Sequence, residues 1–451
     1  MTIAGVGAEV APLSLQQEFL RLFDQGDDTG PFGPRYVITD GWRVRGRVDV
    51  AALRRALDDV CARHESLRTV ISRGAAEPAQ RVLPPASVEL LVHDLPGVPA
   101  AERATRAEEL VNEAEARPFP VTDLPLLRAV LGRFDDRDAV LVLTTHHSAA
   151  DAWSMQVIVR EVAACLAARS AGREPELPEA AQYREYAARQ RENADGPAVA
   201  AAREYWRTTL RGARILVQPT DGPPSGPPTT GWHRFLTSSQ VRANTVRLAA
   251  EKRSSPFMVL LAAFTVLVNR QSGATDIVVP TFAPGRGDRQ FENTVGSFFN
   301  FVPLRVDLVG CRTFSDVVGR VRATCIGAYA HELPLVQVLA EAPELMASAM
   351  APGVAPCLFQ VIQPPFMLEG ERIGELAYEA IWRREISQPI GSDIPDGMLW
   401  SVHVGPSDDL VGAIGFSSHL YRTSTVDGLA QRFVALLGEL VARPDDQLDR
   451  I

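Results

Sequence analysis

The chain has 451 residues, of which 46% are hydrophobic and 22% charged, and its formal net charge is −9 at pH 7. This length exceeds one ordinary hydrophobic core, so two domains of similar size are predicted. The acidic balance argues against nucleic acid as a partner, no apolar run is long enough to span a bilayer, and the N-terminus lacks the features of a signal peptide. The five cysteines are scattered and none has a CxxC partner, which indicates reduced thiols in the cytoplasm.

Helix and strand patterns alternate from Leu13 to about Gly172. Apolar residues at helical spacing predict helices, and short apolar or alternating runs predict strands. Helices are expected over residues 15–23, 50–64 and 100–116, and strands over 36–50, 67–72, 88–93, 126–133 and 139–145. The segment 171–178 (AGREPELP) is a composition break typical of a linker. We therefore expect an N-terminal lobe over residues 1–176 and a C-terminal lobe over residues 177–451.

The second half begins with a long polar helix, expected over 183–210, and a loop rich in Pro, Gly and Thr over 218–230. Helices are then expected over residues 239–252, 256–270, 314–329 and 425–442, and strands over 276–282, 302–308 and 410–417. Both halves end with a strand followed by a helix. This correspondence predicts an α/β protein of two related lobes, with a substrate cleft between them.

One face of the 183–210 helix is expected to gather four arginines, which are Arg203, Arg207, Arg211 and Arg214. A solvated helix face explains such a cluster. A docking patch for an acidic protein explains it as well.

The most informative segment follows the 139–145 strand, where His146 and His147 precede Asp151 at a strand-to-helix junction. A rigidly held imidazole can take a proton from a nucleophile and return it to a leaving group near neutral pH. Other roles fit the same residues. His146 would also serve as a hydrogen-bonded core histidine, Asp151 as the N-cap of the next helix, and the three side chains together as a metal site, although no further ligand stands at a suitable spacing.

Several further segments accompany this motif along nearly the whole chain. In order, they are 13–17 (LSLQQ), 63–69 (RHESLRT), 146–152 (HHSAADA), 183–187 (YREYA), 284–286 (PGR), 295–305 (VGSFFNFVPLR), 331–334 (HELP) and 356–361 (PCLFQV). On these motifs the chain resembles the condensation domains of nonribosomal peptide synthetases, which belong to the chloramphenicol acetyltransferase-like acyltransferases. The resemblance implies an α/β fold of the α+β type, with two such lobes in a V shape and the active-site channel between them.

The resemblance also assigns roles at the site. His147 would be the catalytic histidine facing the channel, and His146 would be mainly structural. Asp151 would be a scaffold residue that pairs with Arg286 of the second lobe, and a surface position of this arginine in its glycine-rich loop is the less favoured alternative. Asn300 would line the channel or bind nearby backbone.

The sequence departs from the family pattern at Ala152, where glycine is usual. Its backbone N–H remains available as an oxyanion donor, but its methyl group would narrow the channel or conflict with a positive φ.

The implied reaction is acyl transfer from the phosphopantetheine thioester of a carrier protein to the amine or hydroxyl of a small-molecule acceptor, without a bound cofactor or metal. No carrier, adenylation or thioesterase segment is visible, so we expect a free-standing enzyme that meets its carrier in trans. Free-standing enzymes resembling this one form esters in enediyne antibiotic biosynthesis. The alternatives are an acyl-coenzyme A-dependent acyltransferase, an epimerising relative, and a non-catalytic domain that recruits partner enzymes.

Overall fold

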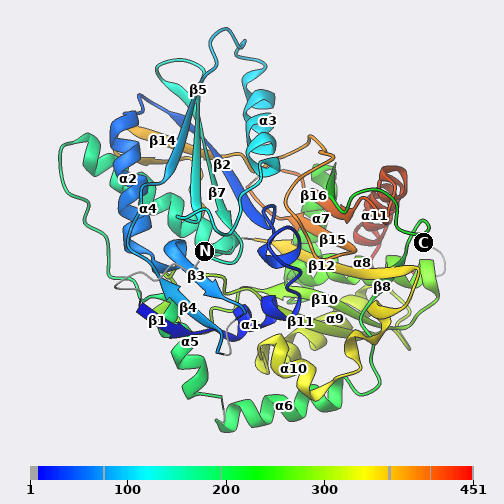
Figure 1. The fold of residues 1–451 in the computed structure, drawn as a ribbon. Helices are drawn as coiled ribbons and strands as arrows, with labels where there is room; N and C mark the ends of the chain where they lie inside the picture. The colour runs from blue at the N-terminus through cyan, green and yellow to red at the C-terminus, as the bar shows by residue number, and fades with distance from the viewer. Residues whose placement is uncertain (1–8, 75–76, 195, 364–366, 407, 449–451) are drawn as a thin grey trace.

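The computed structural model describes residues 9–74, 77–194, 196–363, 367–406 and 408–448. Two α/β lobes lie side by side (Figure 1), as the alternating sequence patterns predict. The N-terminal lobe holds a six-stranded sheet in the order β13-β14-β2-β7-β6-β5, and the C-terminal lobe a five-stranded sheet in the order β8-β12-β15-β16-β9.

The N-terminal sheet is built around β7 (Asp138–His146), every residue of which is buried. Its neighbours are β2 (Val37–Arg45) and β6 (Leu127–Arg133), and β5 (Glu89–Asp94) follows β6 in parallel. Helices α2 (Val50–Arg63) and α4 (Ala152–Ser170) pack on one face of the sheet, and α3 (Arg103–Ala116) packs on the other. The side chains of β7 therefore have helices on both sides, which explains its continuous apolar run.

The N-terminal sheet also contains strands from the later part of the chain. β14 (Leu376–Ala380) pairs antiparallel with β2, and β13 (Glu371–Ile373) pairs with β14. The chain thus returns to the first lobe after building most of the second. The division at residue 176 stays a prediction. The sheet of the N-terminal lobe contains strands from both sides of this residue.

The C-terminal sheet consists of β8 (Val217–Pro219), β12 (Val354–Ile362), β15 (Met398–His403), β16 (Val411–Ser417) and β9 (Thr230–Leu236). One core joins this sheet to α7 (Ser239–Glu251), α8 (Pro256–Ser272), α9 (Phe314–Ala330) and α11 (Thr423–Ala442), together with the hairpin of β10 (Asp276–Ala283) and β11 (Asn300–Asp307). Helix α8 begins with a Ser255 cap followed by Pro256 and ends at Gly273, whose φ is +73°. These residues are typical helix start and stop signals.

Smaller elements surround the junction of the lobes. They are β1 (Glu9–Pro12), α1 (Leu15–Leu22), β3 (Thr69–Ser72), β4 (Ala79–Val82), α5 (Tyr183–Glu192), α6 (Pro197–Thr209) and α10 (Leu335–Glu341). The single helix predicted over 183–210 is wrong, because α5 and α6 are separate. Gly196, with ψ of 155°, is extended before Pro197, as a residue preceding proline usually is. No helix in the described ranges is long and apolar enough to cross a membrane.

Candidate functional site

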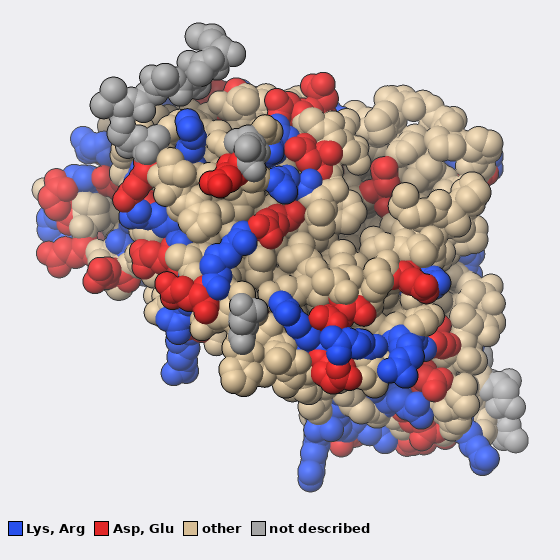
Figure 2. Space-filling view, turned by 60° about the horizontal axis from the view of Figure 1, so that its bottom comes forward, with Lys and Arg blue, Asp and Glu red and all other residues tan. Residues whose placement is uncertain are grey.

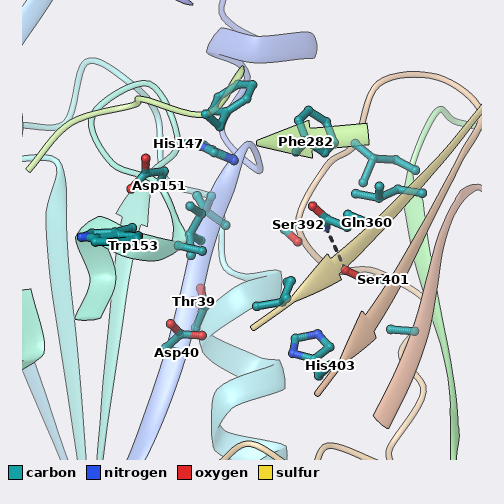
Figure 3. Close-up of a pocket in the computed structure, with 18 of the residues that line it drawn as sticks. Thr39, Asp40, His147, Asp151, Trp153, Phe282, Gln360, Ser392, Ser401 and His403 are labelled. Atoms are coloured by element: carbon teal, nitrogen blue, oxygen red, sulfur yellow. Dashed lines mark hydrogen bonds between the residues drawn. The ribbon is translucent and has the colours of Figure 1, made fainter. Parts of the chain in front are cut away.

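A cavity of about 480 Å³ lies between the two lobes (Figure 3). On the N-terminal side, β14 pairs with β2 only from Trp42 to Arg45, so the Val37–Asp40 part of β2 has a free edge that lines the cavity. On the C-terminal side, strands β9, β12, β15 and β16 and the end of β10 contribute to the lining. Clefts of this kind between lobes are the usual place for a substrate.

His147 lines this cavity at the junction of β7 and α4 (Figure 3). Its Nδ1 lies 2.9 Å from the carbonyl oxygen of Ala150. Because a carbonyl oxygen only accepts hydrogen bonds, Nδ1 must carry the proton and donate it. The Nε2 atom of the neutral ring then keeps its lone pair and is free to accept a proton.

Two aromatic rings hold the His147 imidazole in place. Tyr36 stacks on it with a centroid distance of 4.9 Å and an interplanar angle of 17°, and Phe299 lies 4.8 Å away on a tilted plane. Burial lowers the pKa of His147 below its usual 6.5. The hydrogen-bonded backbone and the charge of Asp151 raise this pKa, but by less than burial lowers it. The ring is therefore neutral near pH 7, which is the form that a general base requires.

His146 is not among the residues that line the cavity, and both its ring nitrogens have protein partners. Its Nδ1 accepts from the backbone N–H of Ser148 at 3.2 Å, and its Nε2 donates to the carbonyl of Gly33 at 3.1 Å. Burial lowers the pKa of His146 to about 4. Both ring nitrogens of His146 therefore have protein partners, and its structural role stays a prediction.

Asp151 caps helix α4 and joins the two lobes. One carboxylate oxygen accepts from the Ser154 backbone N–H at 2.7 Å and from Arg286 at 3.1 Å, and the other accepts from the Phe298 backbone N–H at 3.1 Å. The two side chains are almost fully buried, with 2% of Arg286 and 6% of Asp151 exposed. Both carboxylate oxygens of Asp151 thus accept hydrogen bonds from residues 154, 286 and 298, and its scaffold role stays a prediction. Among the described residues, no group of three or more His, Cys, Asp or Glu side chains is placed so that it could hold a metal ion.

The loop that carries Arg286 is shaped for this contact. Gly285 has φ of +65°, and a Cβ atom there would lie 2.0 Å from the carbonyl oxygen of Phe298. The guanidinium of Arg286 donates to the carbonyls of Phe291 and Thr294 and lies 4.0 Å from the ring centroid of Phe298. Arg286 is thus a buried bridge between lobes, not a surface residue.

Ala152 is the first residue of α4. In the described residues the single non-glycine residue with positive φ is Arg253, so the alanine causes no backbone conflict. Its methyl group lies at the cavity wall. As the first helical residue, it has an N–H without an intrahelical acceptor.

Asn300 lies at a second cavity of about 430 Å³, between α5, α10 and the Gly285–Gly287 loop. Its Nδ2 donates to Glu332 at 3.0 Å and to the carbonyl of Leu333 at 2.8 Å. Of the two roles expected for Asn300, its contacts fit the satisfaction of nearby groups, and it does not line the cavity that holds His147.

The arginines expected on one helix face lie along α6 and the turn after it. Arg207 pairs with Glu341 and Glu204, and Arg214 pairs with Glu344. In Figure 2, basic and acidic side chains are interspersed over the face shown. This mixture favours a solvated surface over a dedicated docking patch.

Three residues of the cavity were not anticipated from the sequence. Tyr36 and Phe299 clamp His147, and Asp40 lines the distal part of the cavity. The three phenylalanines in segment 298–301 (FFNF) are a sequence signal for an aromatic wall of the cavity. An acidic residue inside the apolar strand pattern of 36–50 was a signal for Asp40.

Comparisons with known proteins agree on one family. Residues 8–362 match the Condensation domain family. A linear gramicidin synthase chain of Brevibacillus parabrevis is 32% identical over 447 residues, which cover 98% of this chain. The protein described here spans 8% of the length of that synthetase.

Solved structures give the same result. The SgcC5 protein from Streptomyces globisporus, in a complex with (R)-(-)-1-(2-naphthyl)-1,2-ethanediol and sucrose, is 46% identical with a TM-score of 0.93, and the match covers 97% of this chain and 100% of that one. The X-domain from teicoplanin biosynthesis, solved in a complex with OxyB, is 26% identical with a TM-score of 0.75 and coverage of 99% and 96%. The chain therefore belongs to the condensation-domain family and has the two-lobed, chloramphenicol acetyltransferase-like fold expected from its motifs.

Proposed function

We propose that this protein is an acyltransferase that moves an aminoacyl or acyl group from the phosphopantetheine thioester of a carrier protein, supplied in trans, to a hydroxyl group of a small-molecule acceptor. One observation carries the proposal. The proton of His147 is held on Nδ1 by the Ala150 carbonyl, so Nε2 is available as a base inside the cavity between the lobes.

In the first step, the acceptor hydroxyl oxygen attacks the thioester carbonyl while Nε2 of His147 removes the hydroxyl proton. The carbonyl oxygen becomes an oxyanion, for which the N–H of Ala152, at the start of α4 and at the cavity wall, is a candidate donor. When this intermediate collapses, the carbon–sulfur bond breaks and the imidazolium returns its proton to the thiolate. The products are an ester and the free carrier thiol, and no acyl-enzyme forms.

A hydroxyl acceptor is favoured over an amine for two reasons. A 1,2-diol is bound in the solved structure of the SgcC5 protein, to which this chain is 46% identical. A hydroxyl is also a weaker nucleophile than a free amine and depends more on a base, which suits a neutral His147. The assignment of this ester to enediyne biosynthesis stays a prediction. Amide formation from an amine acceptor stays the alternative prediction.

Two other functions start from the same fold. An acyl-coenzyme A-dependent enzyme would use the same histidine but would not need a carrier protein. A recruitment domain would bind a partner enzyme, and the X-domain from teicoplanin biosynthesis forms such a complex with OxyB. The retained and oriented His147 argues for catalysis.

The test measures product formation by the wild type and His147→Ala. The donors are one aminoacyl group on a carrier protein and on coenzyme A, and the acceptors are an aryl 1,2-diol and the matching amino alcohol. We expect ester formation from the carrier-bound donor, and its loss by a factor of about 10²–10⁴ in the variant.

Equal rates for wild type and variant would overturn the role of His147. Faster transfer from coenzyme A than from the carrier would identify the acyl-coenzyme A enzyme. Carrier binding by the wild type without turnover of any donor would support the recruitment domain.

A further inference from the structure

We propose that Asp40 forms a distal subsite that binds a protonated amine carried by one of the two substrates, far from the reacting carbonyl. This inference deepens the proposed function and rests on it for the identity of the cavity as the substrate site. Figure 3 shows Asp40 and His403 at the end of the cavity opposite to His147.

The position of Asp40 follows from strand register. Val37 of β2 pairs with His146, and Asp40 lies three residues further along β2, opposite Leu143. Three residues of a strand span about 10 Å. An amine bound by Asp40 is therefore too distant to be the attacking group and must belong to another part of a substrate.

The carboxylate of Asp40 is unpaired among the residues that the structure describes. It makes no hydrogen bond or ion pair with any residue in the described ranges, whereas Asp393, which lines the same cavity, lies 3.7 Å from Arg35. Burial raises the pKa of Asp40 to about 6, with Arg384 lowering it and Glu115 raising it. Asp40 is thus ionised at neutral pH.

The positive charges near Asp40 are shared with other carboxylates, although Arg384 lowers the pKa of Asp40. Arg384 pairs with Glu115 at 2.6 Å, and Arg234 is influenced by the charges of Glu115 and Glu108. The positive charges of Arg384 and Arg234 are thus matched by the negative charges of Glu115 and Glu108. Asp40 adds one further negative charge to this group.

The lining near His403 contains both charged and aromatic side chains, since Arg234 and Arg384 line the cavity together with Glu115 and the rings of His403 and Trp382. Burial and the nearby arginines lower the pKa of His403 to about 3, so its ring is neutral. This ring meets Trp382 edge-on at a centroid distance of 5.1 Å, and both rings line the cavity. An unpaired carboxylate beside aromatic rings is a favourable environment for an ammonium group.

The test is a binding measurement with non-reactive ligands, so that it does not depend on acyl transfer. The donor pair is octanoyl and 8-aminooctanoyl aminopantetheine, in which an amide replaces the thioester. The acceptor pair is 1,2-octanediol and 8-amino-1,2-octanediol. In each pair the amine lies about 10 Å from the reacting end, the distance that the strand register predicts.

Calorimetry would compare wild type, Asp40→Asn and the matched control Asp393→Asn. We expect the amino ligand of one pair to bind wild type at least about tenfold more tightly than its unsubstituted partner. The pair that shows this preference identifies the substrate that carries the amine. The preference should disappear in Asp40→Asn and persist in Asp393→Asn.

The proposal is overturned if neither pair shows a preference, or if the preference survives in Asp40→Asn. Failure of the proposed function gives a different result. The transfer assay would then show no carrier-dependent product, while calorimetry could still measure the preference of the wild type for the amino ligand.

Discussion

The two lobes contain the same strand-to-helix junction, but only the N-terminal junction holds a histidine in one fixed orientation. There β7 passes into α4, Nδ1 of His147 donates to Ala150, and Asp151 caps the helix. In the C-terminal lobe β16 passes into α11 through residues 418–422, which include His419. Its Nδ1 has no hydrogen-bond partner in the described parts of the chain, and the cap residue Arg422 makes no side-chain cap bond.

The difference shows that a histidine on such a junction does not by itself reach the cavity between the lobes. The cavity lining includes His147 but not His419. The C-terminal junction is instead tied to its own lobe, for example by Tyr421, whose hydroxyl donates to the Gln218 carbonyl at 3.2 Å. In the proposed function, His147 works where the second lobe covers the junction and the Ala150 carbonyl fixes the ring.

The largest contrast is expected between the two histidines. His147→Ala should lower kcat by about 10²–10⁴-fold, because it removes the base. His419→Ala should change kcat less than about twofold, because His419 is outside the cavity. Steady-state turnover with a carrier-bound donor measures both, and a comparable loss in His419→Ala would contradict the distinction between the junctions.

The two helix caps should differ in stability. Asp151→Ala leaves Arg286 buried without its partner and should lower the free energy of unfolding by about 3–5 kcal/mol. Arg422→Ala removes an exposed side chain without a cap bond and should change it by less than about 0.5 kcal/mol. Urea unfolding followed by circular dichroism gives both values. Equal losses in the free energy of unfolding would show that the contact between Asp151 and Arg286 adds no stability beyond that of an ordinary helix cap.

The pH dependence tests the protonation state at the N-terminal junction. The active form of His147 is neutral and its folded pKa is lowered below 6.5, so protonation, and with it loss of activity, occurs only at more acidic pH. We expect kcat to be constant from pH 8 to 7 and to fall along a limb whose apparent pKa is below 6.5. A single-turnover pH profile with a non-titrating diol measures this limb. An apparent pKa above 6.5 would mean that another group limits the reaction.

The smallest effect is expected for Ala152→Gly, which restores the residue usual in the family. Ala152 already has helical geometry, so kcat/KM should change less than about threefold and the free energy of unfolding by less than about 1 kcal/mol. Turnover and urea unfolding of this variant provide the check. A large gain in kcat/KM would show that the alanine methyl group obstructs the channel.

Local sequence signals predicted the parts of the fold that local physics determines. The buried strand β7, the cap at Asp151 and the helix after it follow from apolar spacing and residue type, and the family motifs pointed to the contact between Asp151 and Arg286. The break between α5 and α6 was readable from Gly196 and Pro197 but was missed. The pairing of β14 with β2 joins residues more than three hundred positions apart, and no local pattern encodes such a register. Asp40 was missed for a related reason, since its lack of a partner depends on side chains from both lobes.

The strands that return to the first lobe set a practical limit on protein engineering. Suppose that the N-terminal lobe is exchanged between relatives by moving only the first part of the chain. Strand β2 of one parent would then pair with β14 of the other parent. The exchange would also split Asp151 from an Arg286 loop selected to fit it. A chimera designed as three segments, with β13 and β14 moved together with β2, keeps the sheet of one parent intact.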